Sequence, residues 1–226
     1  MLPKSIKIAE LVKACQAFNS RYGEMERVLW ALAERSREDL LRNEYSTVVE
    51  EFVWTIKSWW GIQGVRREMK QIAAEALLRL EWRPDLSVQC VDHAENGESF
   101  AIQRVGDLVQ ELQKLGALRR EWSLASKALH WLLPWRIPVY DSFVKRCLRL
   151  PSQGDPKRAY SQIVHWEYDV ARRLLTRDER WLGNLEPKSP FRALDKYLWW
   201  KEGGERDTAA VVKDPWRVIR RIESRI

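Results

Sequence analysis

Residues 118–133 form the segment that most constrains how this chain can fold. On a helix with about 100° per residue, leucine, tryptophan and alanine side chains occupy most of the circumference. The narrow polar strip that remains contains Ser123, Ser126, Lys127 and His130. A helix that is apolar on so many sides is usually central and buried. The sequence therefore predicts a core helix on which Lys127 faces either a cleft or a thin window of solvent.

A proline-bounded link connects this helix to the next one. Pro138 pushes the preceding residue towards an extended conformation, so residues 134–140 cannot be helical throughout. Asp141 suits the N-cap of the following helix, where backbone N–H groups would hold its carboxylate. Because burial disfavours a charged ammonium, Lys127 is a candidate nucleophile. The short separation allows Lys127 and Asp141 to face each other across a cleft.

Apolar residues recur at helical spacing along most of the chain, and strand patterns are nearly absent. The pattern predicts helices at residues 5–20, 24–42, 45–60, 65–82, 99–115, 118–133, 155–175, 190–200 and 216–226, and a further helix from Asp141. Gly23 is expected to end the first helix. The fold class is therefore all-α, with little or no β. The chain forms one unit, or two helical subdomains with a cleft between them, of about 1–20 with 100–226 and of 24–98.

Composition narrows the classes of function. Lysine and arginine number 39 against 32 acidic residues, and the net charge of +7 modestly favours anionic partners such as nucleic acid. The three cysteines lie far apart without metal-binding spacing, which indicates a reducing compartment and no metal. No secretory signal, membrane-spanning run, phosphate loop or dinucleotide fingerprint occurs, so we expect a cytoplasmic protein without a cofactor. A basic face on the last predicted helix would contact phosphates or stay solvated; it comprises Arg217, Arg220, Arg221 and Arg225.

Three motifs carry a family resemblance. Residues 137–146 read IPVYDSFVKR, residues 116–121 read GALRRE ahead of Lys127, and residues 191–200 read FRALDKYLWW. They are similar to the aspartate-bearing link, the entry to the lysine helix and the closing helix of the helix-hairpin-helix DNA glycosylases. The closest pattern is that of the archaeal 8-oxoguanine glycosylases, over roughly residues 110–202. The hairpin's two glycines are absent and only Gly116 is present, so phosphate contacts would come from side chains.

The resemblance implies a role for individual residues. Lys127 would be the nucleophilic or Schiff-base lysine, and Asp141 the activating aspartate. Gln63 would fill the gap left by a flipped base, although residues 61–64 also suit a plain tight turn. The aromatic residues of the base pocket would be Trp131, Trp135 and Trp199. The residues that contact the DNA backbone would be Arg119, Arg120, Lys145 and Arg146.

The resemblance thus implies a DNA repair glycosylase that excises a damaged base, with 8-oxoguanine as a candidate lesion, from double-stranded DNA. It would act as a monomer, with AP lyase activity through a lysine Schiff base, or by hydrolysis with a water oriented by Asp141. Two alternatives stay open. One is a non-catalytic DNA-binding protein on the same fold. The other is a helical protein-interaction module in which most of the 13 tryptophans are core residues.

Overall fold

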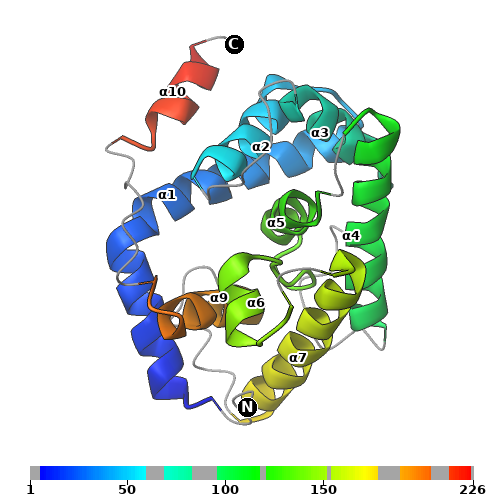
Figure 1. The fold of residues 1–226 in the computed structure, drawn as a ribbon. Helices are drawn as coiled ribbons and strands as arrows, with labels where there is room; N and C mark the ends of the chain where they lie inside the picture. Colours follow the sequence, from blue (N-terminus) through cyan, green and yellow to red (C-terminus); the bar gives the residue numbers. More distant parts are fainter. Residues whose placement is uncertain are drawn as a thin grey trace. The chain divides into compact units, whose positions relative to one another are not determined.

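A computed structural model describes residues 6–59, 69–82, 96–117, 121–151, 154–177, 189–204 and 214–224. Within these segments the chain forms nine α-helices and no strand, which confirms the all-α prediction (Figure 1). The helices are α1 (Ile8–Arg42), α2 (Thr47–Trp59), α3 (Met69–Leu78), α4 (Gly97–Lys114), α5 (Trp122–Leu132), α6 (Ser142–Cys147), α7 (Pro156–Arg177), α9 (Pro190–Lys201) and α10 (Arg217–Glu223). No helix among them is long and apolar enough to cross a bilayer.

The chain divides into two compact units. The first unit comprises Met1–Arg21, Cys90–Arg104 and Pro134–Ala209. The second unit comprises Tyr22–Gln89, Val105–Leu133 and Ala210–Ile226. The division expected from the sequence had grouped all of residues 100–226 with the first twenty. In the structure, residues 105–133 and 210–226 belong to the second unit instead.

The break expected at Gly23 does not occur, and α1 continues through it. The reason lies in the side chains on either side of the glycine, because Tyr22, Met25 and Val28 are all buried. Glycine costs a helix about 1 kcal/mol relative to alanine, whereas burying one large apolar side chain contributes roughly 1.5–3 kcal/mol. The predicted helices at residues 5–20 and 24–42 are therefore a single helix.

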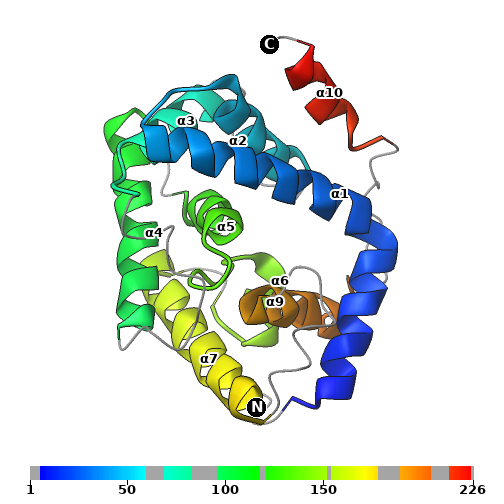
Figure 2. The ribbon, with the colours of Figure 1, turned by 180° about the vertical axis from the view of Figure 1, so that it is seen from behind.

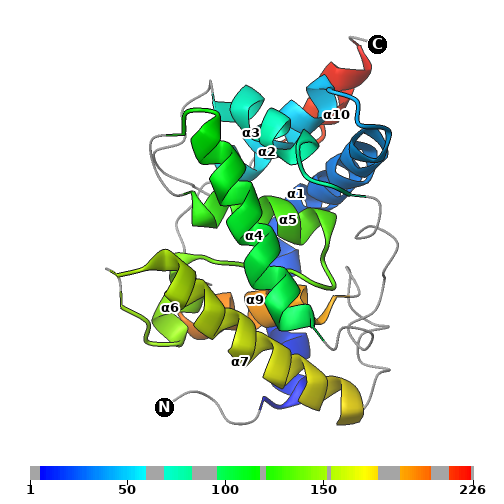
Figure 3. The ribbon, with the colours of Figure 1, turned by 90° about the vertical axis from the view of Figure 1, so that its right-hand side faces the viewer.

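In the first unit, α6, α7 and α9 pack against one another (Figure 3). Two of these helices begin at a proline, directly after a side-chain cap. Asp155 accepts a hydrogen bond from the backbone of Lys157 at 3.1 Å, ahead of Pro156. Ser189 accepts one from the backbone of Arg192 at 3.2 Å, ahead of Pro190. These caps fix where α7 and α9 start, and so which side chains face the core of the unit.

In the second unit, α2 packs against α3 and α5 (Figure 2). It also contacts α10. The helix α5 is buried along its length, from Leu124 through Leu132 and at Trp122. It begins at Trp122, later than the predicted residue 118. The helix α2 is also mostly buried, and its buried residues include the two adjacent glutamates Glu50 and Glu51.

Candidate functional site

Asp141 occupies the N-cap of α6, as the sequence predicted. Its backbone is extended, with φ −143° and ψ 179°, and its carboxylate Oδ1 accepts a hydrogen bond from the backbone N–H of Val144 at 2.9 Å. This bond satisfies one of the donors that a helix leaves unpaired at its start. The side chain of Asp141 is therefore held in one direction at the start of the helix.

The link that leads to Asp141 is fastened by hydroxyl groups. The carbonyl oxygens of Pro134, Arg136 and Pro138 each accept a side-chain hydrogen bond. The donors are the hydroxyl groups of Ser189 at 2.5 Å, Tyr168 at 2.8 Å and Tyr160 at 3.1 Å, respectively. A loop buried in this way needs partners for its backbone groups, and these side chains supply them.

Two of the predicted DNA-contacting residues follow Asp141 on α6. The ammonium of Lys145 lies 5.4 Å from the ring centre of Tyr140, and the guanidinium of Arg146 lies 4.6 Å from that of Phe143. Arg146 also lies 3.5 Å from the carboxylate of Glu202, but its side chain stays more than half exposed. Arg146 is therefore accessible to an anionic partner, whereas Lys145 is only partly exposed.

The predicted pocket residues of the first unit differ in burial. Trp135, in the link, is half-buried. Trp199 is almost completely buried, with its ring edge-on to Phe18 at 5.1 Å between centroids. A side chain at Gly204 would collide with the indole of Trp199, so the glycine is needed for this close approach. Trp199 thus contributes to the packing of the unit, and its role beside a base stays a prediction.

Sequence reasoning missed a buried carboxyl group on α7. The side chain of Glu167 has no exposed surface, and neither of its oxygens has a hydrogen-bond partner within the described segments. Burial, and then the charges of Asp195 and Asp141, raise the pKa of Glu167 well above its ordinary value. The signal in the sequence was a lone charge within an apolar helical stripe. That stripe consists of Tyr160, Ile163, Val164, Glu167, Tyr168, Ala171 and Leu174.

Lys127 lies on α5 in the second unit. Its side chain is 6% exposed, and its neighbours on the predicted polar strip, Ser126 and His130, are fully buried. The strip is therefore enclosed by protein along most of its length. Lysine is almost never this buried without a specific reason, since its ammonium loses hydration there.

Trp131 follows on the same helix and is also buried. Its ring packs edge-on against Trp30, with centroids 4.6 Å apart, and its carbonyl accepts a hydrogen bond from Arg37 at 3.0 Å. These contacts make Trp131 part of the core of the second unit. A place for it in a base pocket stays a prediction.

The remaining predicted residues lie outside the described segments. They are Gln63, Arg119 and Arg120. Of the two predicted catalytic residues, Asp141 belongs to the first unit and Lys127 to the second. Their meeting across a cleft stays a prediction.

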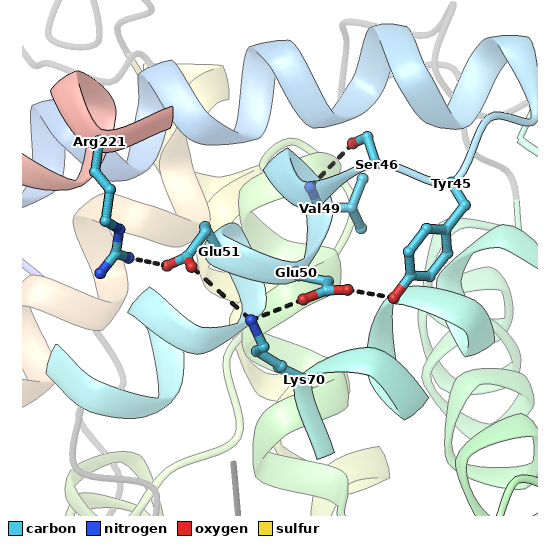
Figure 4. Close-up of polar contacts among 7 residues, drawn as sticks. All are labelled: Tyr45, Ser46, Val49, Glu50, Glu51, Lys70 and Arg221. Atoms are coloured by element: carbon cyan, nitrogen blue, oxygen red, sulfur yellow. Dashed lines mark hydrogen bonds and ion pairs between the residues drawn. The ribbon is translucent and has the colours of Figure 1, made fainter. Parts of the chain in front are cut away.

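The second unit also holds a cluster of charged side chains that sequence reasoning did not single out (Figure 4). The ammonium of Lys70 lies 2.7 Å from a carboxylate oxygen of Glu50 and 3.9 Å from one of Glu51. Tyr45 donates a hydrogen bond to Glu50, and Arg221 of α10 forms an ion pair with Glu51. Each buried glutamate of this cluster thus has partners on two sides.

No group of three or more histidine, cysteine, aspartate or glutamate residues could hold a metal ion in the part of the chain that the structure describes. Comparisons with protein-family models, with curated proteins and with solved structures found no match to this chain. The function must therefore be argued from the residues themselves.

Proposed function

We propose that this protein is a monomeric, cytoplasmic DNA repair glycosylase that excises a damaged base, with 8-oxoguanine as the first candidate lesion. The observation that carries the proposal is Asp141. It stands at the end of a proline-bounded link that Ser189, Tyr168 and Tyr160 fasten, and the backbone of Val144 orients its carboxylate. A carboxylate held in this way suits the stabilisation of positive charge that develops on a sugar.

Lys127 supports the proposal as the second participant. A buried amine is a better nucleophile than a solvated ammonium once it has lost its proton. Lys127 combines this burial with the position that the family motif assigns to the reactive lysine. In addition, Lys145 and Arg146 follow Asp141 on α6 and suit contacts with phosphates.

The proposed reaction starts with a damaged base that has been flipped out of the duplex. Asp141 accepts the ammonium proton of Lys127, and the neutral amine attacks C1′ of the sugar. The bond from C1′ to the base breaks, and the base leaves with the electron pair and takes up a proton. Opening of the sugar ring gives a Schiff base on Lys127. Loss of a proton from C2′ then expels the 3′ phosphate and cuts the strand.

Borohydride trapping tests this proposal. Duplex oligonucleotides containing 8-oxoguanine, uracil or an abasic site are incubated with the protein and borohydride, which reduces a Schiff base to a stable covalent adduct. We expect an adduct with the wild type and with Lys57→Gln, but not with Lys127→Gln. Asp141→Asn should lower excision by at least about 100-fold, whereas Asp155→Asn, which alters the matching N-cap of α7, should leave it unchanged.

Each other outcome would indicate a different function for this protein. Base excision without an adduct would indicate hydrolysis by a water that Asp141 orients. DNA binding without excision would identify the non-catalytic alternative, and its affinity would fall steeply with salt. The absence of both would favour the protein-interaction module. Thermal melting of each variant shows whether a loss of excision reflects a loss of fold.

A further inference from the structure

The hydrogen bonds to the link follow a regular pattern. Its accepting carbonyls belong to every second residue, namely Pro134, Arg136 and Pro138. Residues 134–136 form a turn, and residues 137–140 have no regular secondary structure. Side-chain hydroxyl groups therefore supply these hydrogen bonds to the carbonyls of the link, and two of the donors, Tyr160 and Tyr168, come from α7.

Tyr160 and Tyr168 hold their hydroxyl groups more rigidly than a long, flexible side chain would hold a donor. Both are fully or almost fully buried, and a tyrosine hydroxyl stands at the end of a planar ring with only two side-chain torsions. Tyr160 also packs its ring against Tyr140, with centroids 6.2 Å apart, and Tyr168 packs against Phe191 at 4.7 Å. Burial raises the pKa of both hydroxyl groups, so they keep their protons and remain donors.

The supported link ends directly at Asp141. Tyr160 holds the carbonyl of Pro138 and contacts the ring of Tyr140, which are the third residue and the last residue before the aspartate. The prolines of the link have no N–H groups, so the link can donate fewer backbone hydrogen bonds to hold itself in place. A displacement of the link would therefore move the N-cap of α6 and the carboxylate that it carries.

We propose that Tyr160 and Tyr168 are positioning residues that set the place of Asp141 from the buried face of α7. This inference rests on the proposed function, because it assigns the two hydroxyl groups a purpose in base excision. A displacement of about 1 Å in a reacting group can cost a hundredfold in rate, although the fold persists. The tyrosines should thus affect the chemical step more than they affect DNA binding.

Tyrosine-to-phenylalanine variants provide the test, since they remove only the hydroxyl group and keep the ring. The variants are Tyr160→Phe, Tyr168→Phe and the double variant. Tyr197→Phe is the matched control, because Tyr197 is equally buried in the same unit but its hydroxyl lies 3.5 Å from Glu10 and does not hold the link. Excision is measured under single-turnover conditions, and affinity with DNA that carries a stable abasic-site analogue.

We expect the double variant to excise about 10 to 100 times more slowly than the wild type, with an affinity within about twofold of it and a Tm close to that of Tyr197→Phe. Rates equal to that of Tyr197→Phe would overturn the inference alone, as long as the wild type is active. A parallel fall in rate, affinity and Tm would also overturn it, because the tyrosines would then be structural. A wild type that excises no lesion would overturn the proposed function, and this inference with it.

Discussion

Two buried glutamates, Glu50 of the second unit and Glu167 of the first, have opposite surroundings. In the second unit, Glu50 and Glu51 stand side by side on α2, and Lys70, Arg221 and Tyr45 surround them with donors (Figure 4). In the first unit, Glu167 is fully buried on α7, and neither of its oxygens accepts a hydrogen bond within the described segments. The surroundings of Glu50 therefore favour a charged carboxylate, and those of Glu167 favour a neutral carboxyl group.

The pKa values of Glu50 and Glu167 shift in opposite directions. Burial acts to raise the pKa of Glu50, but hydrogen bonds from Lys70 and Tyr45 outweigh it and hold the pKa below its ordinary value. For Glu167 burial acts without such donors, and the nearby charges of Asp195 and Asp141 raise its pKa further. The same side chain thus becomes an anion or a neutral acid according to the donors around it.

The difference matters for the candidate site because Glu167 lies within electrostatic range of Asp141. A neutral Glu167 adds no negative charge beside Asp141. The burial that raises the pKa of Glu167 therefore reduces the negative charge near the carboxylate that the proposed reaction uses.

The largest expected effect on stability comes from removing the ammonium group of Lys70, which lies between Glu50 and Glu51. Lys70→Ala leaves two adjacent buried glutamates with one ion-pair partner, so we expect the free energy of unfolding to fall by about 3 kcal/mol. Urea denaturation at pH 7 measures this change. Lys57→Ala, on the same unit, is the control and should change stability by less than about 1 kcal/mol. A loss for Lys70→Ala as small as that of the control would show that the glutamates do not need their partner.

The second prediction concerns Glu167→Gln and pH. The folded state of the wild type binds the Glu167 proton more tightly than the unfolded state does, so wild-type stability is highest below the ordinary pKa and falls as pH rises towards the folded value. Glu167→Gln does not lose stability in this way as pH rises, because its amide does not ionise. Its advantage over the wild type should grow between pH 5 and pH 9, by at most about 1.4 kcal/mol per pH unit.

Denaturation curves of both proteins across that range provide the measurement, and Glu50→Gln provides the mirror-image control. The pKa of Glu50 is lowered in the folded state, so its contribution is present above the ordinary pKa and disappears as pH falls through the folded value. The wild type should thus exceed Glu50→Gln at neutral pH and lose that advantage in acid. An advantage of Glu167→Gln that stays constant with pH would contradict a neutral Glu167.

The smallest effect is expected at the edge of the cluster. The side chain of Arg221 is 47% exposed, so its ion pair with Glu51 is partly screened by solvent. Arg221→Ala should lower the free energy of unfolding by about 0.5 kcal/mol at low salt and by less at 1 M salt. Arg217→Ala, at an exposed position of the same helix, serves as the control. A loss comparable to that of Lys70→Ala would mean that Arg221 is the principal partner of the glutamates.

Local signals in the sequence predicted much of the described fold. Asp141 is a cap, as predicted, because short polar side chains bond to the backbone a few residues ahead, and this chemistry involves no distant residue. Pro138 likewise predicted that residues 134–140 are not helical throughout. By contrast, Gly23 suggested a break that α1 does not have, because buried side chains on both sides outweigh the local cost of glycine.

The residues around the candidate site were less accessible to sequence reasoning. Tyr160 and Tyr168 lie more than twenty residues from the carbonyls that they hold, so nothing in the local pattern connects them with the link. Glu167 was visible only as a charge in an apolar stripe, and its lack of a donor depends on what α6 and α9 place beside α7. Lys127 was recognised as isolated on its helix, but its degree of burial was not predictable.

The sequence by itself determined the all-α class, most helix positions, the N-cap at Asp141 and the non-helical link before it, because these depend on interactions between near neighbours. Only the tertiary structure decided that Glu50 keeps its charge while Glu167 is driven towards the neutral form, and that tyrosines of α7 hold the link. The physical reason is that ionisation and positioning depend on desolvation and on donors from distant segments, which the fold brings together.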